Sequence, residues 1–174
     1  MNHSNQKRRT GFTLLELTVS TAMLAMLATA CMMLVRTSYT AWNRHEDDQA
    51  QRQEGLLVLQ HIARQVRQSK SVMAITVASD NSGSLSLLTT DGRLLVWDHN
   101  AATKEVLYGE NTATDVLAKG IDELTFVGIK VNGIDQTTEL GLIHSVECTT
   151  KVNIARPAGT EVVAASCRAW LRAW

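Results

Sequence analysis

Proline and aromatic residues are scarce in this chain of 174 residues, which has one proline, Pro157, and 5% aromatic side chains. Acidic and basic residues balance at 17 each, so the net charge does not indicate a polyanionic partner such as nucleic acid. The GxSxG and CxxC motifs and the phosphate-binding loop are also absent from the sequence. We therefore expect neither an enzyme nor a nucleic-acid-binding protein, and we expect no cofactor.

Possible metal ligands do not occur at metal-binding spacing. Residues 45–48 read His-Glu-Asp-Asp, but they lack the turn-forming glycine of a calcium loop, and Gln49 breaks the HExxH zinc pattern. Other residues that could carry chemistry or contacts stand alone in the sequence, which favours surface or packing positions for His61, His99, His144, Trp97, Trp170 and Trp174. We expect no metal site.

One long apolar run dominates the N-terminal part of the chain. Residues 12–35 contain a single charged residue, Glu16. As a helix this run would be roughly 36 Å long, which is enough to cross a bilayer. Basic residues flank it, with Lys7, Arg8 and Arg9 before it and Arg36 after it. The three crowded basic residues favour a cytoplasmic N-terminus.

Glu16 is an unusual residue for such a helix. A carboxylate inside a membrane costs on the order of a few kcal/mol near the bilayer centre and less near an interface, so it needs a partner or access to water. Glu16 lies about one helical turn after Phe12, close to the expected start of the helix. The pattern therefore predicts either a charge partner or access to water for Glu16, near the membrane surface.

The segment 7–17 reads Lys-Arg-Arg-Thr-Gly-Phe-Thr-Leu-Leu-Glu-Leu, which resembles the signature of type IV prepilins and type II secretion pseudopilins. The resemblance implies that a prepilin peptidase cuts between Gly11 and Phe12 on the cytoplasmic face and then methylates the Phe12 amine. Glycine suits such a site because it leaves the backbone accessible to the peptidase. Lys7, Arg8 and Arg9 would then be the basic residues of the leader.

The same resemblance gives Glu16 a role in assembly. Glu16 would become the fifth residue of the mature chain and would meet the N-terminal amine of a neighbouring subunit, so that two charges poorly tolerated in lipid compensate each other. The implied partners are prepilin peptidase, other pilins or pseudopilins through the N-terminal helix, and an inner-membrane assembly platform. The implied location is the bacterial inner membrane, with a cytoplasmic leader, a periplasmic head and incorporation into a pilus or pseudopilus.

Helical periodicity returns after a polar stretch. Leu56, Leu59, Ala63 and Val66 recur at helical spacing, with Leu57 and Ile62 widening the stripe. We expect one helix from Phe12 to about Ser69. The predicted division is a leader at 1–11, a transmembrane assembly helix at 12–35, an extramembrane amphipathic helix at 36–70 and a β-sheet head at 71–174.

The remaining segments alternate between β-branched runs and turn residues, which indicates strands. The expected fold class is α+β, with the long helix packed against an antiparallel sheet. Thr90-Asp91-Gly92-Arg93 predicts a hairpin turn. The expected strands are 72–78, 84–89, 93–97, 105–108, 123–131, 141–153 and 162–171. This order, with segments 85–108 and 116–126, resembles J-type pseudopilins and W-type minor pilins.

Two cysteines lie symmetrically about residues 156–159. A simple hairpin places Cys148 opposite Cys167, at a separation compatible with a disulfide, and an oxidising compartment would permit the bond. The inward positions of the two strands would be Val146, Cys148, Thr150 and Val152 opposite Ala169, Cys167, Ala165 and Val163. The alternative is two buried free thiols, and a one-residue bulge would change the register.

A different anchor remains possible around Cys31. Ala28-Thr29-Ala30-Cys31 has the small residues of a signal-peptidase or lipoprotein cleavage site. The apolar run continues to Val35, however, and that cut would leave Glu16 unexplained. We favour Cys31 as a small hydrophobic residue of a membrane helix. The alternative function is a signal-anchored or lipidated periplasmic binding domain that does not polymerise.

Overall fold

The computed structural model describes residues 13–156 and 159–172. Its one long helix, α1, covers Leu14–Gln68. The chain divides into two compact units, one ending at Glu46 and the other beginning at Asp47, and α1 contributes residues to both. The extent of α1 within the described residues confirms the prediction of one long helix that ends near Ser69.

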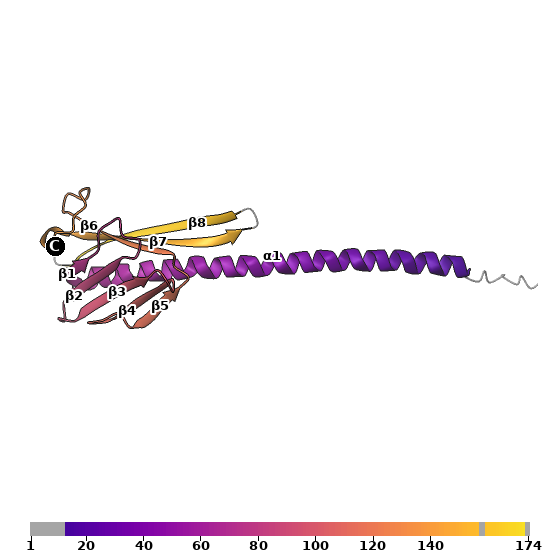
Figure 1. Cartoon of the computed structure of the whole chain (residues 1–174), viewed down its shortest axis with the longest axis horizontal. Coiled ribbons are helices and arrows are strands. Elements are labelled where there is room, and N and C mark those ends of the chain that lie inside the picture. Colours follow the sequence, from indigo (N-terminus) through magenta and orange to yellow (C-terminus); the bar gives the residue numbers. More distant parts are fainter. Residues whose placement is uncertain (1–12, 157–158, 173–174) are drawn as a thin grey trace, which may run out of the picture. The chain divides into compact units, whose positions relative to one another are not determined.

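The second unit contains two antiparallel sheets (Figure 1). The first follows chain order, β1-β2-β3-β4-β5, and the second has the order β6-β7-β8. The strands are β1 (Ser69–Ile75), β2 (Ser84–Thr89), β3 (Leu94–Asn100), β4 (Glu105–Glu110), β5 (Asp115–Lys119), β6 (Glu123–Ile129), β7 (Ser145–Arg156) and β8 (Gly159–Trp170), and a short 3-10 helix, η1, covers Leu140–Leu142. The predicted α+β class is confirmed, although the expected single sheet is two.

One hydrophobic core joins the C-terminal part of α1 to both sheets. Trp97 and Phe126 are fully buried and are the largest side chains of this core, one from each sheet. Figure 1 draws the labelled strands of the two sheets on either side of the C-terminal part of α1. The helix residues buried between them are Val58, Leu59, Ile62 and Val66.

The buried stripe of α1 differs in part from the predicted one. Leu56 and Leu57 were expected in it, but they are 48% and 57% exposed. The buried face instead begins at Gly55, where an added Cβ would lie 3.3 Å from Thr150 Oγ1. The second sheet therefore approaches the helix at the position with no side chain, and this contact sets which side of a broad apolar stripe is covered.

Some strand boundaries also differ from the prediction. β5 was not expected as a strand, because only one of its five residues, Ala118, is buried. Residues 141–144 were expected to open a strand, but η1 occupies part of that segment and β7 begins at Ser145. The predicted turn at Asp91-Gly92 is confirmed, since Gly92 has φ 83° and its N–H donates to Thr89 O at 3.1 Å.

Candidate assembly segment and head surfaces

The first turn of α1 is capped by Thr13. The Glu16 N–H lies 3.3 Å from Thr13 Oγ1 and 3.0 Å from Thr13 O. A threonine oxygen that accepts from the third residue of the helix is a standard N-terminal cap, and Thr-x-x-Glu is the sequence pattern of the capping box. The sequence interpretation missed Thr13, although this pattern could have identified it. Glu16 thus also suits the positive end of the helix dipole.

The side chains of α1 that follow Glu16 form an apolar surface without protein cover. An 18-residue window of α1 has a mean hydropathy of 1.9, and none of it is buried. Leu24, Met26 and Met32, for example, are 69%, 73% and 75% exposed. Apolar surface on this scale is unfavourable in water. The helix is long and apolar enough to cross a membrane.

The predicted processing residues cannot be placed. Lys7, Arg8, Arg9, Gly11 and Phe12 lie outside the described residues. Cleavage after Gly11 and methylation of Phe12 therefore stay predictions. Of the predicted N-terminal site residues, Glu16 alone lies within the described part of the chain, where it is exposed and where it makes no ion pair with any described residue.

The register of the β7–β8 hairpin agrees with the predicted one. Cys148 pairs with Cys167, Val146 with Ala169 and Val152 with Val163, without a bulge. The two thiols are not bonded to each other in the structure. Burial raises the pKa of Cys148 well above its usual range and also raises the pKa of Cys167, so both thiols are protonated at neutral pH. The disulfide itself stays a prediction.

The isolated histidines lie in packing environments. His99 is 3% exposed, and its Nε2 lies 2.9 Å from Ile121 O, which requires the proton on Nε2 because a carbonyl only accepts. His61 is half-buried on α1 and contacts the rings of Trp97 and Tyr108, with a centroid distance of 4.7 Å to Tyr108. His144 is also partly buried, at the start of the β7 segment.

The tryptophans singled out in the sequence have different surroundings. Trp97 is fully buried in the core, whereas Trp170 is 54% exposed and lies 5.7 Å from the Arg168 guanidinium carbon, measured to its ring centroid. Trp174 lies outside the described residues.

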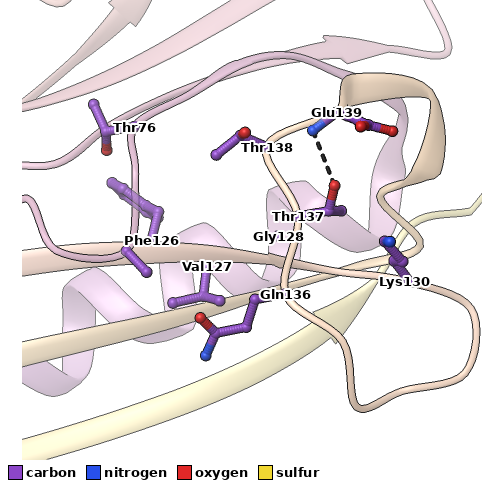
Figure 2. Close-up of a pocket in the computed structure, with 10 residues that line it drawn as sticks. Thr76, Phe126, Val127, Gly128, Lys130, Gln136, Thr137, Thr138 and Glu139 are labelled. Atoms are coloured by element: carbon purple, nitrogen blue, oxygen red, sulfur yellow. Dashed lines mark hydrogen bonds between the residues drawn. The ribbon is translucent and has the colours of Figure 1, made fainter.

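A polar hollow of about 390 Å³ lies between β6 and the segment that follows it. Figure 2 shows Thr137, Thr138 and Glu139 on one side and residues of β6 on the other; the Glu139 N–H donates to Thr137 Oγ1 at 3.0 Å. The wall is tight at Gly128, because an added Cβ would lie 2.5 Å from Thr137 O. The hollow has the size of a small-molecule site. Its polar lining consists of neutral threonine and amide side chains, together with the charged residues Lys130 and Glu139.

In the described residues, no group of three or more His, Cys, Asp or Glu side chains is placed to hold a metal ion. No family model, curated protein or solved structure matches this chain.

Proposed function

We propose that this chain is a minor pilin or pseudopilin, a structural subunit of a type II secretion or type IV pilus filament. In this proposal a prepilin peptidase removes residues 1–11 and methylates Phe12. The mature helix then holds the chain in the bacterial inner membrane, with the β-sheet head in the periplasm. Assembly transfers the apolar helix from lipid into contact with the helices of neighbouring subunits.

The observation that carries the proposal is the position of Glu16. It is the single charge of residues 12–35, and it lies in the first turn of a helix whose apolar N-terminal part is uncovered. Its carboxylate makes no ion pair within the described residues. A partner supplied by another subunit would compensate this charge, and a free N-terminal amine is a suitable one.

The capping geometry offers a competing explanation for Glu16, because a carboxylate at this position also stabilises an isolated helix. The two explanations predict different effects for different substitutions. Glu16→Gln keeps a side chain that can complete a capping box but removes the charge. Thr13→Ala keeps the charge but removes the hydroxyl that accepts from the Glu16 N–H.

The experiment measures the fraction of processed chain that copurifies with filaments from a host that assembles them. We expect Glu16→Gln to be processed normally. The fraction of it in filaments should fall about tenfold or more, because a buried charge pair is lost. We expect Thr13→Ala to enter at close to the normal level, because a lost cap costs only about 1 kcal/mol. Normal incorporation of Glu16→Gln, or equal losses for both variants, would contradict the assembly role.

A further inference from the structure

The last strand of the smaller sheet has an unpaired edge. β8 pairs with β7 along all of Gly159–Trp170, and no other backbone hydrogen bond involves these residues in the part of the chain that the structure describes. Half of the backbone N–H and C=O groups of a strand point toward each neighbour, so the groups on the outer edge of β8 have no strand partner. Exposed edges of this kind accept additional strands.

The other sheet edges are shorter or covered. The outer edge of β6 bonds to neighbouring segments, since the Gly83 N–H donates to Leu124 O at 2.8 Å and the Thr137 N–H donates to Gly128 O at 2.8 Å. β5 is five residues long and ends in a charged residue, Lys119. Short strands and bulges are common protections of an edge, but β8 has 12 residues and no bulge.

β8 also borders a groove on α1. The groove has a volume of about 490 Å³, and it runs between the helix and the strand at Ser166 and Cys167. The Cys167 sulfur lies 3.4 Å from Leu59 O, so β8 lies directly beside the helix. Leu56, Leu59 and Ala63 supply apolar surface within this groove. A strand added to β8 would lay alternate side chains over this helix surface.

The groove carries positive charge. Arg64 and Arg67 line it, no carboxylate does, and neither arginine makes an ion pair with the described residues. The two arginines are three positions apart on one helix face, which places their Cβ atoms about 5–6 Å apart. Alternate residues of a strand are roughly 7 Å apart, so two acidic side chains at alternate positions would match both guanidinium groups.

We propose that the β8 edge and this groove bind an extended acidic segment of a partner protein as an added strand. Backbone hydrogen bonds to β8 provide the pairing, and acidic side chains at alternate positions contact Arg64 and Arg67. An apolar side chain before them fills the space over Leu56 and Ala63. This binding mode does not depend on Glu16 or on entry into a filament.

The test uses the full chain in detergent micelles and a short labelled peptide in which valine, glutamate and glutamate alternate with threonine. A second peptide carries lysine in place of both glutamates. We expect the acidic peptide to bind, to slow hydrogen exchange in β8 and to bind about tenfold more tightly than the lysine peptide, because two ion pairs become two repulsions.

Charge-reversed variants then locate the site. We expect Arg64→Glu with Arg67→Glu to reverse the preference between the two peptides. The matched control is Lys70→Glu, an exposed cation outside the groove, which should leave the preference unchanged. Equal binding of the two peptides, or protection of another strand, would overturn the proposal. Protection of β8 that rises with protein concentration in the absence of peptide would show a second copy as the occupant and would also overturn it.

Discussion

At the scale of single residues, His61 connects the helix to the core of the head. The Trp97 Nε1–H points to His61 Nδ1 at 3.4 Å, and Tyr108 packs edge-on against the same ring. Burial, and then the charge of Arg64, lower the pKa of His61 below its usual value of 6.5. The unfolded chain therefore binds this proton more tightly than the folded chain does.

We predict that protonation of His61 lowers the free energy of unfolding of the head in mild acid. The stabilisation that neutral His61 provides is complete above the unfolded pKa of 6.5, and it is lost as pH falls through that value toward the lower pKa of the folded state. Urea unfolding between about pH 7.5 and pH 5 measures this, with His61→Gln as the variant that cannot titrate. The wild type should lose more free energy of unfolding over this range than the variant; identical pH dependences would contradict the account.

Gly83 lies at a close backbone contact with β6. A Cβ at Gly83 would lie 2.7 Å from Leu124 O, the same oxygen that accepts the Gly83 N–H. We predict that Gly83→Ala lowers the free energy of unfolding by about 2 kcal/mol, because the backbone must move to admit a methyl group. The control is Gly141→Ala, where nothing lies within 4 Å. Equal urea midpoints for the two variants would be inconsistent with this close contact.

At the scale of elements, the β7–β8 hairpin is held to α1 by charge at one end. Arg156 and Glu161 pair with each other at 2.9 Å, and they reach Asp48 and Arg52 on the helix. Exposed ion pairs of this kind contribute little to stability, because solvent and salt screen them. The other end of the hairpin is buried against the core through Val146 and Ala169. The two cysteines lie nearer this buried end.

We predict that Cys148 and Cys167 form a disulfide when the chain reaches an oxidising compartment. The strand register already places them opposite each other, and the bond would stabilise the folded state by about 3 kcal/mol through the loop that it closes. Mass spectrometry of tryptic peptides without reduction identifies the bond, and Cys148→Ala with Cys167→Ala is the control for stability. Two free thiols in protein recovered from the periplasm would contradict the prediction.

At the scale of the whole molecule, the sequence predicts local features better than distant ones. The hairpin register could be predicted because both strands lie next to one turn, so their pairing is a local property. The prediction of the buried stripe of α1 was wrong at Leu56 and Leu57. The approach of Thr150 to Gly55, a contact between distant segments, decides which side of the helix is covered. The division into two sheets depends on geometry that alternating hydrophobicity does not record, whereas the cap at Thr13 could have been predicted from the Thr-x-x-Glu pattern.

Mass spectrometry of the intact mature chain is the most direct measurement of the central claim, since the filament proposal requires a particular N-terminus. We predict a chain that begins at Phe12 and carries one methyl group on its amine. A chain that keeps Met1 and the leader, or one that begins at a lipid-modified Cys31, would contradict the account. The second result would favour a lipidated binding domain that does not polymerise.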